Sequence, residues 1–144
     1  MNILMATSEA VPFAKTGGLA DVCGALPIEL SNLGHQTAVI LPAYRSVLEG
    51  ADDLQTLDVR LEIPIGSKTV AGGLMRGKLP GTDVPIYFVR HDDYFDRAEL
   101  YRESGHDYRD NCERFVFFSR AVMESIRLLD LSIDVIHVND WQTS

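Results

Sequence analysis

Apolar residues change their spacing from one segment of the chain to the next, and these changes predict the elements of the fold. Asn2–Thr7 is a short, nearly continuous apolar run, as expected of a strand in a parallel sheet covered on both faces. From Leu19 to Leu33 the apolar residues follow helical spacing, and Gly34 is well placed to end this helix. Thr37–Leu41 is again extended and apolar. The order strand, helix, strand predicts a βαβ unit with a right-handed crossover.

The middle of the chain predicts an antiparallel addition to this sheet. Arg60–Ile65 alternates between apolar and polar residues, and a turn at Gly66 and Ser67 leads into a second extended segment near Thr69–Leu79. Proline cannot donate to a strand ladder, so Pro64 favours an edge position for the hairpin.

The last third of the chain returns to alternating strands and helices. Val84–Val89 is typical of a buried strand, and Asp134–Val138 is the last predicted strand. Between them, Asp110 with Glu113 resembles an acidic N-cap followed by its N3 partner, and the spacing from Phe115 onward predicts a long helix. The sequence therefore predicts an α/β fold with an open, mostly parallel, Rossmann-like sheet that carries an antiparallel hairpin.

Composition and charge narrow the possible functions. The chain has 144 residues, of which 46% are hydrophobic and 24% charged, which is one domain's worth of ordinary globular sequence. The net charge of −8, without any stretch that is both basic and aromatic, disfavours nucleic acid as a partner. No stretch approaches the length of a membrane span, so no membrane partner is expected. An anionic ligand must therefore be held by a local group of donors.

Three potentially reactive side chains are interpreted as ordinary core residues. Cys23 and Cys112 lie in helical apolar patterns without CxxC spacing, which favours buried free thiols in a reducing compartment. His137 lies inside the last predicted strand and is interpreted as a satisfied core histidine. The first apolar run also lacks the basic flank and cleavage site of a targeting segment, so a cytoplasmic location is expected.

The loop "AKTGGLAD" between the first strand and the first helix is a candidate anion site. A helix N-terminus offers unpaired N–H groups, Gly17 and Gly18 allow a phosphate to come close, and Lys15 adds a full positive charge. In open α/β sheets, ligands bind beyond the carboxyl ends of the strands, where this loop lies. The alternative is a helix-capping turn with an exposed lysine. A nucleotide-cofactor oxidoreductase domain is disfavoured because the G-x-G-x-x-G fingerprint is missing, and a P-loop is excluded.

The longer string "SEAVPFAKTGGLADVCGALP" resembles the N-terminal signature of bacterial glycogen synthases and plant starch synthases, the ADP-glucose-dependent glucan synthases. The resemblance continues in "LPAY", "DNCERFVFFSRA" and "DVIHVNDWQT" and covers the whole chain. It implies a GT-B fold, in which two Rossmann-like domains face each other across a cleft. Residues 1–144 are then expected to be part of the N-terminal domain, with the C-terminal GT-B domain absent from the chain.

The resemblance implies roles for several residues of the signature. Lys15 matches the lysine that binds the phosphates of ADP-glucose, and Gly17 and Gly18 match the glycines whose backbone meets the nucleotide sugar. Asp21 matches an aspartate near the reacting sugar or the acceptor, and the alternative is a surface carboxylate that interacts with the helix dipole. Asp140 matches an aspartate that borders the active site.

Four further positions are implied to contact substrate. Asn139 and Trp141 flank Asp140 beyond the last predicted strand, and Asp110 and Asn111 match a family Asp-Asn pair for which helix capping is the alternative. Gln142 stands where family members usually have histidine. Glutamine does not titrate, so no acid–base role is assigned to position 142.

The implied reaction is the transfer of glucose from ADP-glucose to the 4-OH at the non-reducing end of an α-1,4-glucan, with retention. ADP-glucose or ADP and the glucan are the expected ligands, and no metal or further cofactor is implied. The acidic stretch "HDDYFDR" could suggest a metal site, but its spacing is not that of a defined site, so it is interpreted as a solvated loop. Because the family's second domain supplies essential groups, the chain alone is expected to be inactive; the alternative is a truncated fragment that only binds nucleotide sugar or glucan. A sheet that lacks later strands is also expected to expose an edge and to favour self-association.

Overall fold

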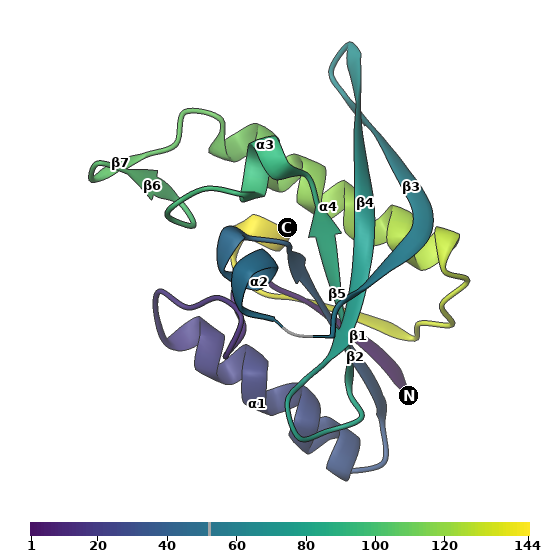
Figure 1. The fold of residues 1–144 in the computed structure, drawn as a ribbon. Helices are drawn as coiled ribbons and strands as arrows, with labels where there is room; N and C mark the ends of the chain where they lie inside the picture. Colours follow the sequence, from purple (N-terminus) through teal and green to yellow (C-terminus); the bar gives the residue numbers. More distant parts are fainter. Residues whose placement is uncertain (52) are drawn as a thin grey trace.

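A six-stranded sheet with the strand order β3-β4-β5-β2-β1-β8 is the centre of the computed structural model, which describes residues 1–51 and 53–144 (Figure 1). The strands of this sheet are β1 (Asn2–Ala6), β2 (Gln36–Pro42), β3 (Gln55–Ile65), β4 (Lys68–Lys78), β5 (Pro85–Arg90) and β8 (Val135–Val138). A small separate ribbon consists of β6 (Arg102–Glu103) and β7 (His106–Asp107). The helices are α1 (Gly18–Asn32), α2 (Arg45–Gly50), α3 (Asp92–Phe95), α4 (Asn111–Leu128) and the 3₁₀ turn η1 (Trp141–Thr143). Figure 1 shows α1 and α4 on opposite faces of the sheet.

The sheet confirms the predicted fold class. Strands β5, β2, β1 and β8 run parallel, whereas β4 pairs antiparallel with both β5 and β3. Pro64 lies in β3, which is an edge strand as predicted, and the missing N–H of proline is tolerated there. Gly34 follows α1 with φ +89°, the left-handed conformation expected of a residue that ends a helix.

The carboxyl ends of the parallel strands lie together at one end of the sheet. Ala6, the last residue of β1, pairs with Ile40 of β2 and with Val138 of β8. The segments that follow these strands therefore begin side by side. They carry most of the residues that the sequence assigns to the site.

Strand β8 is the outermost strand on the side of the sheet opposite β3. This position corrects the interpretation of His137. This side chain is exposed rather than part of the core, because no described strand pairs with the outer side of β8. Val135 and Val138 of the same strand are 42% and 49% exposed. The expected apolar edge is thus present, while self-association stays a prediction. Cys23 is buried as expected, but Cys112, at the start of α4, is exposed.

Gly72 of β4 allows helix α4 to pack directly on the sheet. A Cβ atom at this position would lie 2.8 Å from Cζ of Phe117 and 2.9 Å from the carbonyl oxygen of Arg90. We expect Gly72→Ala to lower the free energy of unfolding by about 1–3 kcal/mol, because the core would be overpacked. Gly73→Ala is the matched control, since a Cβ there meets nothing within 4 Å. Urea unfolding compares the two variants, and equal losses of stability would contradict this account of the packing.

Candidate functional site

The loop between β1 and α1 presents Lys15 at the carboxyl end of the sheet. The loop is closed by a short antiparallel bridge in which the N–H of Ala10 donates to the carbonyl oxygen of Ala14 at 3.1 Å. Nζ of Lys15 lies 2.6 and 2.8 Å from the two carboxylate oxygens of Asp21. These two side chains are 51% and 57% exposed, so the ion pair adds little stability and can be opened by a competing anion.

Glu9 supplies a buried carboxylate behind this loop. It is only 4% exposed. Oε2 accepts hydrogen bonds from the N–H groups of Thr16 and Gly17 at 2.6 and 3.2 Å, and Oε1 accepts from the hydroxyl groups of Thr16 and Tyr101 at 2.6 and 2.9 Å. No sequence motif assigned a role to Glu9. The signal that could have found it is a carboxylate placed three residues after a buried strand and before a glycine turn at a helix N-terminus.

The hydrogen bonds decide the charge of Glu9. Burial alone would raise the pKa of Glu9, but the hydrogen bonds from Thr16, Tyr101 and Gly17 outweigh burial and hold the pKa below its ordinary value. Glu9 is therefore ionised at neutral pH. Burial raises the pKa of Tyr101, and the negative charge of Glu9 raises it further, so this phenol remains a neutral donor.

A cavity of about 760 Å³ opens between the loop and the segment that follows α3. Its lining includes Lys15, Thr16, Tyr44, Arg97, Tyr101 and Arg102. The hydroxyl group of Tyr44 is buried and has no hydrogen-bond partner among the described residues. The cavity thus combines cations, aromatic rings and one unpaired polar group, which suits a ligand that is both charged and rich in hydroxyl groups.

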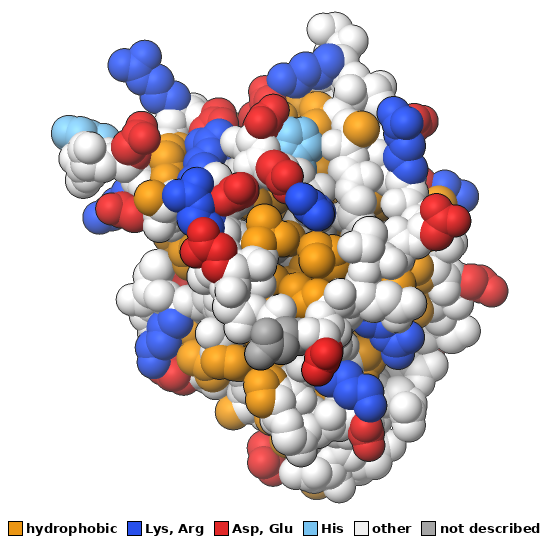
Figure 2. All heavy atoms as spheres, viewed as in Figure 1, with side chains coloured by type: hydrophobic (Ala, Val, Ile, Leu, Met, Phe, Trp, Pro, Cys, Tyr) orange, Lys and Arg blue, Asp and Glu red, His pale blue; other side chains and the backbone are white. Residues whose placement is uncertain are grey.

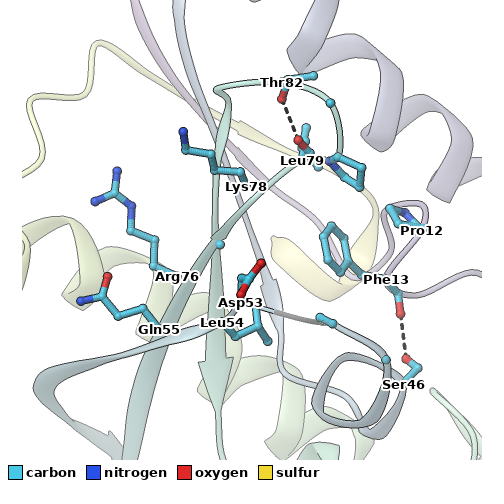
Figure 3. Close-up of a pocket in the computed structure, with 15 residues that line it drawn as sticks. Pro12, Phe13, Ser46, Asp53, Leu54, Gln55, Arg76, Lys78, Leu79 and Thr82 are labelled. Atoms are coloured by element: carbon cyan, nitrogen blue, oxygen red, sulfur yellow. Dashed lines mark hydrogen bonds between the residues drawn. The ribbon is translucent and has the colours of Figure 1, made fainter.

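A second cavity, of about 860 Å³, lies on the other side of Phe13. Figure 3 shows Arg76 and Lys78 on one side of it and Pro12 and Phe13 on the other. The hydroxyl group of Ser46 donates to the carbonyl oxygen of Phe13 at 2.8 Å and helps to hold the wall between the two cavities. None of the site residues assigned from the sequence lines this second cavity, so we place the candidate site in the first.

The segment after β8 is joined to the end of β1. The N–H of Asn139 and its side-chain amide both donate to the carbonyl oxygen of Ala6, at 3.1 and 3.0 Å. Asp140 has φ +66°, and its carboxylate accepts a hydrogen bond from the N–H of Trp141 at 2.7 Å. This local bond stabilises the start of η1 and leaves the Asp140 side chain exposed at the edge of the sheet.

Trp141 connects this segment to the cavity. Its ring packs edge-on against Phe115 with centroids 5.2 Å apart, and its centroid lies 6.4 Å from that of Tyr101, yet 53% of its surface stays exposed. Gln142 points inward and is buried, and its side-chain oxygen has no hydrogen-bond partner in the part of the chain that the structure describes.

Asp110 does not cap helix α4 with its side chain. It occupies the N-cap position, but its carboxylate accepts hydrogen bonds from Nη1 and Nη2 of Arg97 at 2.8 and 2.5 Å. These bonds hold the pKa of Asp110 below its ordinary value. The prediction that Glu113 is the N3 partner of this cap is also wrong. Its carboxylate instead pairs with Lys68 and accepts from the hydroxyl group of Tyr94. Asp110 thus fixes a cavity residue and does not itself line the cavity.

Asn111 and Arg114 hold the same cavity wall from behind. The Asn111 amide donates to the carbonyl oxygen of Tyr101 at 3.0 Å, and its oxygen accepts from Nη1 of Arg114 at 2.7 Å. Arg114 is fully buried and donates to the carbonyl oxygens of Tyr94 at 2.6 Å and Leu100 at 3.0 Å. No sequence pattern indicates this role of Arg114, because two of its acceptors are backbone carbonyl oxygens of another segment.

The stretch "HDDYFDR" is not a solvated loop as predicted, because it forms α3, in which Tyr94 and Phe95 are buried. Two of its aspartates form ion pairs. Arg90 contacts Asp92 at 2.9 Å and Arg45 contacts Asp96 at 2.7 Å. Figure 2 shows acidic and basic side chains next to one another over this part of the surface. No group of three or more His, Cys, Asp or Glu residues among those described is arranged to hold a metal ion. No helix in the described ranges is both long and apolar enough to cross a membrane.

The chain is similar to known proteins over nearly its whole length. A family model described as "Starch synthase catalytic domain" matches residues 2–144. The glycogen synthase of Syntrophotalea carbinolica is 50% identical over 143 residues, which are 99% of this chain and 29% of the relative. The glycogen synthase of Rhodopirellula baltica is 41% identical over 153 residues, which cover 100% of this chain and 30% of that protein.

A solved structure matches in fold as well. The catalytic domain of starch synthase IV from Arabidopsis thaliana, bound to ADP and acarbose, superposes with a TM-score of 0.82 at 33% identity, over 99% of this chain and 28% of that chain. The chain thus spans less than a third of the length of the relatives it matches. With the family model covering all but its first residue, the chain belongs to the starch synthase catalytic domain family.

Proposed function

We propose that this chain forms one wall of the active site of a retaining hexosyltransferase. The enzyme transfers glucose from ADP-glucose to the non-reducing 4-OH of an α-1,4-glucan. The observation that carries the proposal is the position of Lys15, which is exposed at the N-terminus of α1 and lines the cavity. Family membership and a structural relative whose catalytic domain binds ADP and acarbose support it.

Lys15 is proposed to bind the donor phosphates by exchanging its partner. A pyrophosphate carries more charge than the carboxylate of Asp21 and replaces it on Nζ. In the described part of the chain, the N–H groups of Gly18 and Leu19 have no acceptor, so they are open to the same anion. Charge grows on the leaving ADP as the glycosidic bond breaks, and a fixed cation beside it lowers the barrier.

The two aspartates are proposed to face the sugars. Asp21 loses its lysine partner when phosphate binds, so its carboxylate becomes free to accept from a sugar hydroxyl. Asp140 is exposed at the end of β8, beside the exposed ring of Trp141, and aromatic rings next to carboxylates suit the apolar faces and hydroxyl groups of glucose units. Asn139 is fixed by Ala6 and positions this segment. Direct contacts of Asp110 and Asn111 with substrate stay predictions, since both side chains are engaged within the chain.

We further propose that residues 1–144 work as part of a longer polypeptide. Transfer requires both donor and acceptor to be oriented and shielded from water, and one wall of a cleft does not do this. The second candidate function, a fragment that binds nucleotide sugar or glucan without transferring glucose, is favoured by the same cavity if no second domain is present.

The test is an assay of ADP release by a chimeric enzyme. In this chimera, residues 1–144 replace the matching 29% of the Syntrophotalea carbinolica relative. We expect ADP release that requires both ADP-glucose and a malto-oligosaccharide, and none from the isolated chain. A folded chimera that releases no ADP would count against the proposed activity, and glucan elongation by the isolated chain would show that one wall is sufficient.

A further inference from the structure

We propose that Glu9 is a positioning residue, whose buried carboxylate fixes the Lys15–Gly17 loop and Tyr101 in the arrangement that receives the donor. The inference rests on the proposed function: Glu9 occupies N–H groups that the sequence predicts to bind a substrate anion. The start of α1 was expected to bind a substrate anion through its N–H groups. In the structure, the N–H groups of Thr16 and Gly17 already bind the chain's own carboxylate.

Glu9 acts through other residues because it does not line the cavity. Thr16 and Tyr101 do line it, and both donate to Glu9. These two residues are 85 positions apart in the sequence, and both donate to the same oxygen of Glu9. One carboxylate therefore sets the distance between the glycine loop and the aromatic wall.

The carboxylate is held by hydrogen bonds and not by a cation. None of the ion pairs formed by the described residues includes Glu9. The titratable groups that face it are the phenols of Tyr101 and Tyr44 and the thiol of Cys23, and burial raises the pKa of each. They stay neutral at neutral pH. The charge of Glu9 is thus balanced by its four donors and by the positive end of α1, and losing the charge releases all of them at once.

This arrangement divides the loop into a fixed part and an open part. Thr16 and Gly17 are fixed by Glu9, whereas the ammonium group of Lys15 and the N–H groups of Gly18 and Leu19 remain for the ligand. The donor phosphate is accordingly recognised by Lys15 and the first turn of α1. We call the hydrogen bonds that Glu9 accepts from Thr16, Gly17 and Tyr101 the Glu9 clamp. Without this clamp, Thr16 and Gly17 are free to reorient, and Lys15 moves with them.

The first experiment measures the clamp directly in the 144-residue chain. In ¹H–¹⁵N NMR spectra, the amide shifts of Thr16 and Gly17 should titrate together with Glu9. Because the pKa of Glu9 is lowered, the clamp is complete above the ordinary pKa of glutamate, about 4.3, and is lost as the pH falls through the lower value of the folded state. In Glu9→Gln, this titration should disappear and hydrogen exchange of both amides should accelerate about tenfold or more. Glu29→Gln, at an exposed glutamate of α1, should change neither.

The second experiment measures the consequence for transfer in the chimeric enzyme. We expect Glu9→Gln to lower kcat by about 10- to 100-fold with a smaller change in KM for ADP-glucose, because a misplaced lysine costs more in the transition state than in the ground state. The part of the acid limb of the kcat profile that follows the titration of Glu9 should also be missing from this variant. Thermal melts of both proteins show whether unfolding accounts for the loss.

The outcomes separate this inference from the proposed function. Wild-type amide titration in Glu9→Gln, or wild-type kcat with an unchanged pH profile, would overturn the positioning role. A loss of activity matched by the fraction of unfolded enzyme would also overturn it. The NMR result supports or overturns the clamp whether or not the chimera transfers glucose, so an inactive chimera counts against the proposed function alone.

Discussion

Replacing Lys15 with alanine in the chimeric enzyme is expected to lower catalytic efficiency with ADP-glucose by about 30- to 900-fold, or about 2–4 kcal/mol in transition-state stabilisation. The lysine meets charge that grows as ADP departs, so kcat should fall as well as donor affinity. Folding should barely change, because the ion pair of Lys15 with Asp21 is more than half exposed on both sides. Steady-state kinetics and a thermal melt of the same preparation measure the two effects.

Two further variants make this result specific to position 15. Lys15→Arg should recover only part of the activity, because a planar guanidinium does not reproduce a compact ammonium beside a glycine turn. Lys78→Ala is the matched control: Lys78 is another exposed lysine paired with an aspartate, Asp83, and it lines the second cavity. Near-wild-type efficiency in Lys15→Ala, or an equal loss in Lys78→Ala, would contradict a phosphate-binding role for Lys15.

Replacing Arg114 with methionine is expected to lower the free energy of unfolding by about 3 kcal/mol or more. Methionine fills part of the space but leaves the carbonyl oxygens of Tyr94 and Leu100 and the side-chain oxygen of Asn111 without their donor. These acceptors are in or beside the wall that carries Tyr101. The cavity should therefore loosen along with the fold, and hydrogen exchange in residues 94–101 should accelerate more than in β2.

Urea unfolding gives the size of this effect, and Arg127→Met is its control. Arg127 is on the same helix, but its guanidinium is exposed and pairs with Glu124 one turn away. Its replacement should cost less than about 0.5 kcal/mol. Similar midpoints for Arg114→Met and Arg127→Met would show that the buried guanidinium is not what holds the wall.

Much of the sheet follows from local pattern, because buried parallel strands need continuous apolar runs and Pro64 is tolerated only at an edge. The position of Lys15 follows too, because the loop that connects a strand to the next helix begins at the carboxyl end of that strand. The exposure of His137 could not be predicted in this way. It depends on which strands neighbour β8, and strand order is a property of the whole sheet.

The candidate site was less predictable where distant segments meet. Nothing near Glu9 in the sequence shows that Tyr101, 92 positions later, donates to it. Asp110 has the residue type and position of a cap, and only the folded chain brings Arg97 close enough to take its carboxylate. In both cases a charge-assisted hydrogen bond from another segment sets what the carboxylate does, and the local sequence does not show which segment supplies the donor.

The most direct test of the central claim is an NMR titration of the isotopically labelled chain with ADP-glucose at millimolar concentration. The claim is that the loop at the start of α1, and not the second cavity, binds the donor phosphates. It predicts shifts at the amides of Lys15, Gly18, Leu19 and Asp21, and their loss in Lys15→Ala. Residues 76–82, which line the second cavity, should not move. Shifts confined to residues 76–82, with none in the loop, would contradict the claim.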